Sequence, residues 1–144
     1  HSLFNVVTNK ESIPHAVLIR GIHPIDGIST ILSRRKTKEP LHKIANGPGK
    51  LSKALGIKFR KHNNLDLLGD EVWIEDHSIT VNAKDILIGP RVGVDYAGED
   101  ALLPYRFLWK RQSPNSTFCR RHPARSNLAT AKPSTAAKCR CFDA

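Results

Sequence analysis

The sequence predicts an α+β fold with an antiparallel or mixed sheet and short helices. Runs rich in Val, Ile and Phe lie near the start of the chain and again before residue 110, and segments with helical apolar spacing lie between them. Strands, then helices, then strands in this order are typical of α+β proteins. The length of 144 residues suits one domain, which we place at residues 1–110.

Two strands are expected first, at residues 3–8 and 15–22. Both runs have the β-branched and aromatic composition of strands. The segment between them, NKESIP, is polar and ends in Pro14, as turns often do. We therefore expect a β-hairpin.

A helix is expected next within residues 23–36. Ile28, Ile31 and Leu32 fall on one helical face, and the segment ends in basic residues that suit a helix C-terminus.

A second, two-turn helix is expected within NGPGKLSKALGI, residues 46–57. Leu51, Ala54 and Leu55 lie at the i, i+3 and i+4 positions of an apolar stripe. Helix boundaries are indicated by Asn46 or Gly47 as the cap, Pro48 in the first turn and Gly56 at the end.

Three later segments have strand character. They are residues 70–76, residues 85–98 with a break at Gly89-Pro90, and residues 105–110. Beyond them the periodic pattern stops, so we expect residues 111–144 to form a basic, disordered tail.

The positive charge is concentrated in that tail. Residues 1–109 contain 15 Lys and Arg against 12 Asp and Glu, whereas residues 110–144 contain 8 against 1. Such an excess indicates either a polyanion partner such as nucleic acid or a solvated tail. The tail also contains Cys119, Cys139 and Cys141, an odd number whose spacing fits no standard zinc site.

Several functional classes find no support in the sequence. No apolar run reaches the length of a membrane span, and the first residues do not resemble a signal peptide, so we expect a soluble intracellular protein. Neither a zinc-protease HExxH motif nor a GxSxG nucleophile elbow occurs. Adjacent carboxylates such as Asp70 and Glu71 fall where strands or turns are expected to end, which favours surface positions.

Asn5 and Arg20 are polar residues inside apolar runs. A buried guanidinium needs a carboxylate, a phosphate, a wet pocket or a path to solvent; otherwise Arg20 is an outward-facing edge residue. The Asn5 amide either bonds to neighbouring backbone or points into a ligand pocket.

Lys50, Lys53 and Lys58 surround the second predicted helix. Free N–H groups at a helix start attract anions, and nearby lysines add positive charge. The segment is not a P-loop, because Ile44 stands where the first glycine of that motif belongs. The alternative is a solvated lysine face opposite the apolar stripe.

Several segments in order resemble the alkyladenine (3-methyladenine) DNA glycosylases over roughly residues 1–109. They are LFNVVTN (3–9), AVLIRGIHPIDG (16–27), NGPGKLSKALGI (46–57), LLGDEVWIED (67–76) and RVGVDYAGE (91–99), followed by Arg106-Phe107. The resemblance implies a domain with a curved, mostly antiparallel sheet.

This resemblance also implies an activity. These enzymes flip a damaged purine out of duplex DNA and hydrolyse its N-glycosidic bond with a carboxylate-activated water. It implies double-stranded DNA containing damaged purines as partner, no cofactor and no metal, no membrane, and a monomer. The corresponding location is the cytoplasm and nucleoid of a bacterium or the nucleus of a eukaryote.

The resemblance assigns roles to individual residues. Asn5 matches the pocket asparagine that disfavours guanine, Arg20 the arginine that holds the attacking water and the adjoining phosphate, and Val92 a residue whose backbone faces the flipped base. Lys50 matches a phosphate-contacting lysine at a helix start, and Lys53 and Lys58 lie close to it.

The catalytic glutamate, the base-stacking aromatics and the groove-inserting tyrosine of the family precede the segments matched here. Within the match, no carboxylate takes the general-base position; Glu11 lies in a turn without motif support. We therefore expect the chain alone to have little or no glycosylase activity. The alternative is a non-catalytic remnant that binds the DNA backbone.

Overall fold

The computed structural model describes residues 1–110 and 138–143, which fall into two compact units. Residues 1–75 and 138–143 belong to the first unit and residues 76–110 to the second. Both combine short helices with antiparallel strands, so the α+β prediction is confirmed at that level. In the described ranges, no helix is long and apolar enough to cross a membrane.

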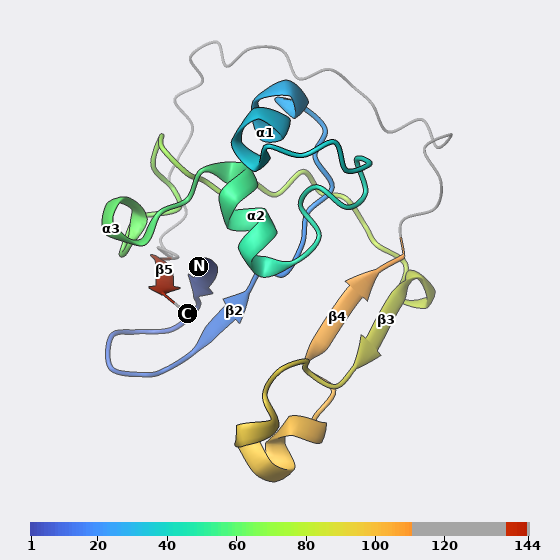
Figure 1. Cartoon of the computed structure of the whole chain (residues 1–144). Coiled ribbons are helices and arrows are strands. Elements are labelled where there is room, and N and C mark those ends of the chain that lie inside the picture. The colour runs from blue at the N-terminus through green and yellow to red at the C-terminus, as the bar shows by residue number, and fades with distance from the viewer. Residues whose placement is uncertain (111–137, 144) are drawn as a thin grey trace. The chain divides into compact units, whose positions relative to one another are not determined.

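A three-stranded sheet in the order β2-β1-β5 forms one layer of the first unit (Figure 1). β1 (Ser2–Val7) pairs antiparallel with β2 (Ala16–Leu18), which confirms the predicted hairpin, although β2 is shorter than expected. Thr8 and His15 close the hairpin turn, because the Thr8 amide donates to the His15 carbonyl over 3.1 Å.

The third strand of this sheet differs from our expectation of disorder in the tail. β5 (Lys138–Asp143) pairs antiparallel with the second edge of β1, from Ser2 opposite Asp143 to Val7 opposite Lys138. Its first four residues, KCRC, alternate in character with a two-residue period, a short signal that the composition of the whole tail obscures. The remaining tail residues, 111–137 and 144, lie outside the described part of the chain.

Helix α1 (Ile28–Arg35) is the first predicted helix, and it begins five residues later than the segment we considered. Gly27 occupies the left-handed region with φ 66°, so it turns the chain into the helix. Ile31 is buried and Leu32 packs beside it, as their spacing indicated.

Helix α2 (Pro48–Leu55) has the predicted boundaries. Gly47 is its N-cap, Pro48 is its first residue, and Gly56 ends it in the left-handed conformation with φ 75°. Of its predicted apolar stripe, Leu51 and Ala54 are completely buried, whereas Leu55 is partly exposed.

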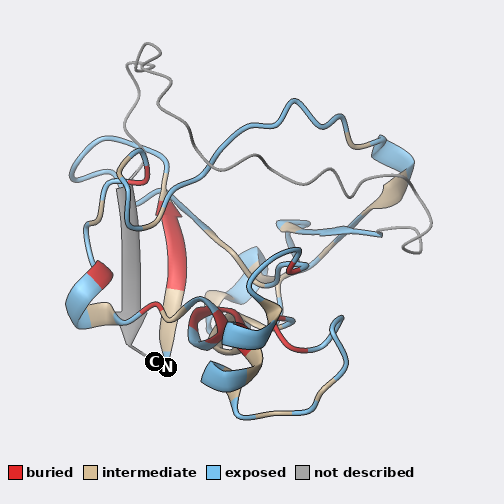
Figure 2. Ribbon diagram, turned by 90° about the horizontal axis from the view of Figure 1, so that it is seen from above, coloured by how far each residue is buried: buried red, intermediate tan, exposed pale blue. Residues whose placement is uncertain are grey.

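The two buried side chains of α2 enter two different apolar clusters. Leu51 packs with Phe4 and Val6 of β1 and with Ile57 and Leu67. Ala54 packs in a second cluster whose other members are Ile31, Ile44 and Ala45. Figure 2 shows the buried middle of β1 in red. The helix therefore joins the sheet to α1 and the loop that precedes α2.

Two arginines at the end of α1 attach that helix to its surroundings. Arg34 Nη1 donates to the carbonyls of Ala54 and Leu55, at 3.3 and 2.8 Å, and so caps the C-terminus of α2. Arg35 Nε donates to the Ile44 carbonyl over 3.1 Å. These bonds explain why α1 and α2 lie side by side (Figure 1).

The predicted strand at residues 70–76 is wrong. Asp66 forms a turn instead, since its carboxylate accepts from the Leu68 amide and its carbonyl accepts from the Gly69 amide. The Ile74 amide then donates to the Leu67 carbonyl, which closes a loop. The turn at Asp66 and the loop that follows it therefore form where the apolar residues of 70–76 predicted a strand. A short helix that we did not predict, α3 (Phe59–His62), precedes this loop.

The second unit is built on a two-stranded antiparallel sheet of β3 (Ile86–Gly89) and β4 (Arg106–Trp109). The short helix η1 (Ala83–Asp85) precedes β3, and the irregular 3₁₀ segment η2 (Asp95–Leu102) connects the strands. The strand over 85–98 therefore ends at Gly89, where the break was predicted, and the strand over 105–110 is confirmed.

Replacing Gly56 with alanine should lower the free energy of unfolding by about 1 kcal/mol, because a left-handed residue with a Cβ is strained. The new Cβ would also lie 3.1 to 3.3 Å from the Arg34 guanidinium. Gly49→Ala in the same helix is the control, since its Cβ would meet only ordinary contacts at 3.5 Å or more. Urea unfolding followed by circular dichroism measures both, and equal stability of the two variants would contradict the expectation.

Candidate nucleic-acid interface

Asn5 lies in the middle of β1 and is 8% exposed. Its neighbours Phe4 and Val6 point into the apolar core, and side chains alternate along a strand, so Asn5 faces the opposite side of the sheet. Among the described residues, nothing forms a hydrogen bond with its carboxamide. The sequence left two alternatives for Asn5, and the absence of a backbone partner favours an amide available to a ligand.

Arg20 follows β2 and shares that face of the sheet with Asn5. The Ile19 amide donates to the Phe4 carbonyl over 3.0 Å, and Ile19 packs on the same core as Phe4. Because side chains alternate, Arg20 points to the other side, as Leu18 does opposite Asn5. Its guanidinium is partly buried and has no partner in the described residues.

The backbone of Arg20 leads directly to the start of α2. Its carbonyl accepts a 2.9 Å hydrogen bond from the Gly47 amide, and Gly21 forms a bridge to Asn46. The helix N-terminus and the strand segment that carries Arg20 are thereby held together. Arg20 and the start of α2, which the sequence analysis considered separately, therefore lie in one region.

The first turn of α2 has the properties of an anion-binding helix start. Pro48 has no N–H, and no described residue accepts a hydrogen bond from the Gly49 or Lys50 amide. Gly47 has φ 122°, a conformation that favours glycine and turns the chain into the helix. The two free donors and the helix dipole create a positive potential at this end.

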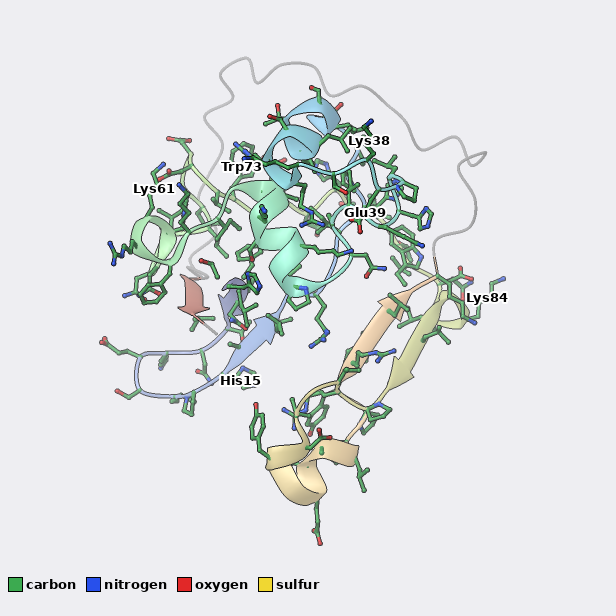
Figure 3. All side chains as sticks on the ribbon, viewed as in Figure 1. His15, Lys38, Glu39, Lys61, Trp73 and Lys84 are labelled. Carbon is green, nitrogen blue, oxygen red and sulfur yellow. The ribbon has the colours of Figure 1, made fainter. Side chains whose placement is uncertain are left out.

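The Lys50 side chain extends from this turn to Glu39, a residue that the sequence reasoning missed. Lys50 Nζ lies 2.8 Å from Glu39 Oε1, and Arg35 Nη2 lies 3.1 Å from Glu39 Oε2. Glu39 lies in the segment between α1 and α2 (Figure 3). The hydrogen bond from Lys50 lowers the pKa of Glu39 below its ordinary value, dehydration opposes this effect, and Arg35 adds to it.

Lys53 and Lys58 are both exposed, and neither side chain has a partner in the described part of the chain. The Lys58 amide donates to His62 Nδ1 over 3.0 Å, which holds the start of α3. Nearby, Lys61 forms an ion pair with Glu71, and the hydrogen bond from Lys61 lowers the pKa of Glu71. Exposed lysines thus continue the positive region beyond α2. Both an anion-binding site and a solvated lysine face are compatible with this exposure.

Val92 belongs to the second unit and is 52% exposed. The chain around it is held by Arg91, whose Nη2 donates to the Asp100 carbonyl over 2.9 Å and whose guanidinium lies 6.0 Å from the Tyr105 ring centre.

Across residues 1–110 and 138–143, no three His, Cys, Asp or Glu residues form a group that could hold a metal ion.

Comparison with known proteins assigns the chain to a family. The family model of methylpurine-DNA glycosylases matches residues 1–113, which is most of the chain. The chain belongs to the methylpurine-DNA glycosylase family. This confirms the resemblance to the 3-methyladenine DNA glycosylases.

Several curated relatives of this chain bear the name "Putative 3-methyladenine DNA glycosylase". A protein of Chlamydia felis is 42% identical over 109 residues, which cover 75% of this chain and 54% of the relative. One of the archaeon Methanocella arvoryzae is 44% identical over 115 residues, covering 79% and 55%. One of Bacillus subtilis is 37% identical over 111 residues, covering 74% and 52%. The chain therefore spans about half the length of these relatives.

Glu39→Gln should reduce the loss of stability in acid. Because the pKa of Glu39 is lower in the folded protein, its pairing stabilises the fold above the unfolded pKa of about 4.5 and is lost as the pH falls through the folded value. The free energy of unfolding of the variant should therefore decline less than that of the wild type below about pH 4.5.

Lys50→Gln should flatten the same pH dependence in part, because Arg35 remains next to Glu39. Urea unfolding at a series of pH values measures the effect. Parallel pH curves for wild type and Glu39→Gln would show that the ion pair does not stabilise the fold.

Proposed function

We propose that the chain takes part in DNA base-excision repair, as the portion of a monofunctional glycosylase that holds duplex DNA and the flipped nucleotide. The reaction is hydrolysis of the N-glycosidic bond of alkylated or deaminated purines. The observation that carries this proposal is the family match over residues 1–113. A monomer suffices for it, because one base-flipping site acts on one nucleotide.

The flipped base would lie against Asn5. An asparagine carboxamide at the pocket wall clashes with the exocyclic amine of guanine, so normal guanine is rejected while purines without that group are accepted. Asn5 supports this role because it is buried on the side of the sheet away from the core and has no partner among the described residues. Val92 would contribute its backbone, which only the resemblance suggests.

Arg20 would hold the attacking water and the phosphate beside it. A guanidinium without a carboxylate partner is free to form charge-assisted hydrogen bonds with a phosphate. In the described residues Arg20 has no such partner, which supports the proposal. It shares a sheet face with Asn5, so a nucleotide near one side chain can reach the other.

The DNA backbone would bind at the start of α2. The free Gly49 and Lys50 amides can donate to a phosphate, and the Lys50 ammonium adds a full charge. Lys53 and Lys58 would contact neighbouring phosphates. The Gly47–Arg20 hydrogen bond keeps this phosphate site in a constant position relative to Arg20.

The general base is a component for which residues 1–75 offer no candidate, because no carboxylate among them is paired with Arg20. We therefore propose that this chain alone releases damaged bases slowly or not at all. A turnover assay with duplex DNA containing hypoxanthine or an alkylated adenine tests this, and the expected result is binding without appreciable base release. Rapid release would refute the proposal of low activity. Tight, salt-sensitive binding that does not distinguish damaged from normal duplex would instead favour a non-catalytic remnant that binds the DNA backbone.

Lys50→Gln should weaken binding to duplex DNA by about two- to tenfold and reduce the slope of log K against log salt by up to about 0.9, the value for one full phosphate contact. The matched control is Lys10→Gln, which removes the same charge from the exposed hairpin turn. Fluorescence anisotropy at several salt concentrations measures both variants. An unchanged affinity together with an unchanged slope in Lys50→Gln would exclude a phosphate contact at Lys50.

A further inference from the structure

The charge around α2 is almost entirely positive. Residues 27–65 contain ten Lys and Arg but one acidic residue, Glu39. Glu39 contacts Lys50, the lysine at the helix start that carries the free amides.

The Glu39 carboxylate binds its cations as a phosphate would. Its two oxygens accept from two different side chains, Lys50 at 2.8 Å and Arg35 at 3.1 Å. The position is fixed by the backbone, because the Glu39 amide donates to Thr37 Oγ1 over 3.2 Å and Arg35 is tied to the Ile44 carbonyl. In the protein without DNA, the Glu39 carboxylate is therefore paired with the Lys50 ammonium.

The Glu39 pair is nevertheless easy to exchange. The side chains of Lys50 and Glu39 are 40% and 32% exposed, so water solvates both charges once they separate. Exposed ion pairs of this kind contribute little net stability. A DNA phosphate, which also gains the two free amides of the α2 start, can displace Glu39 from Lys50. Arg35 is 13% exposed and is anchored at Ile44, so it can keep the displaced carboxylate nearby.

We propose that Glu39 competes with the DNA phosphate for Lys50 and thereby sets the affinity and the salt dependence of this interface. The proposal rests on the phosphate-binding role proposed for Lys50. Competition lowers the affinity for any duplex, damaged or not, because the contact is to the backbone. It also reduces the salt dependence, because Lys50 exchanges one anion for another.

Glu39→Gln should therefore bind an undamaged, fluorescein-labelled DNA duplex about two- to fivefold more tightly than wild type. Its slope of log K against log salt should be steeper by the part of the value for one phosphate contact, about 0.9, that Glu39 suppresses in the wild type. Glu11→Gln is the matched control, since it makes the same change in net charge in the exposed hairpin turn. In a Lys50→Gln background the gain from Glu39→Gln should disappear.

The outcomes separate this proposal from the one it depends on. If Lys50→Gln binds like wild type, the phosphate role of Lys50 fails. If Lys50→Gln weakens binding but Glu39→Gln does not strengthen it, the phosphate role stands and the competition is refuted. The competition is equally refuted if Glu11→Gln gains as much as Glu39→Gln, because the effect is then one of net charge.

A measurement on the wild-type chain covers the case in which Glu39→Gln fails to fold. The pKa of the Glu39 carboxyl, followed by carbon NMR, should rise when the protein is saturated with duplex DNA, because the carboxylate loses Lys50 and gains a nearby phosphate. An unchanged pKa in the complex would overturn the proposal.

Discussion

The hydrogen bond from the Gly47 amide to the Arg20 carbonyl organises the first unit. It joins the strand segment after β2 to the start of α2, and the glycine conformation at φ 122° lets the chain enter the helix from that point. Packing supports the same arrangement, because Leu51 and Ala54 fix α2 against two apolar clusters. The positions of Arg20 and of the free amides of α2 relative to each other depend on this junction.

The basic residues of this unit divide into two kinds. Arg34 and Arg35 donate to backbone carbonyls and hold α1 against α2 and its preceding loop. Lys53 and Lys58 project into solvent. This division follows from chemistry, since the guanidinium is a planar multiple donor suited to carbonyl groups, whereas a flexible ammonium suits a mobile anion. Net charge alone would have treated these residues as equivalent.

The parts of the structure that depend on local signals could be predicted from the sequence. The Gly-Pro start and the glycine end gave the boundaries of α2, and apolar runs gave β1 and β4. The parts that depend on distant neighbours could not. β5 forms by pairing with an edge of β1 that is more than 130 positions away in the sequence. In the described residues, the segment at 70–76 has no strand beside it. Glu39 contacts Lys50, which lies eleven positions further along the chain. Whether Asn5 and Arg20 find partners among the described residues is likewise a tertiary property, which left their roles open at the level of sequence.

The location of His1 affects how this protein can be attached to other molecules. The His1 side chain lies about 3.5 Å from the place where a Cβ on Gly49 would be, so the first residue of the chain touches the first turn of α2. Asp143 is paired with Ser2, which brings the last strand to the same end of β1. A purification tag or immobilising linker on either end would therefore lie near the first turn of α2, where we propose that the DNA backbone binds. Ser12, exposed in the turn at the far end of β1, is a better place to attach a dye or a surface.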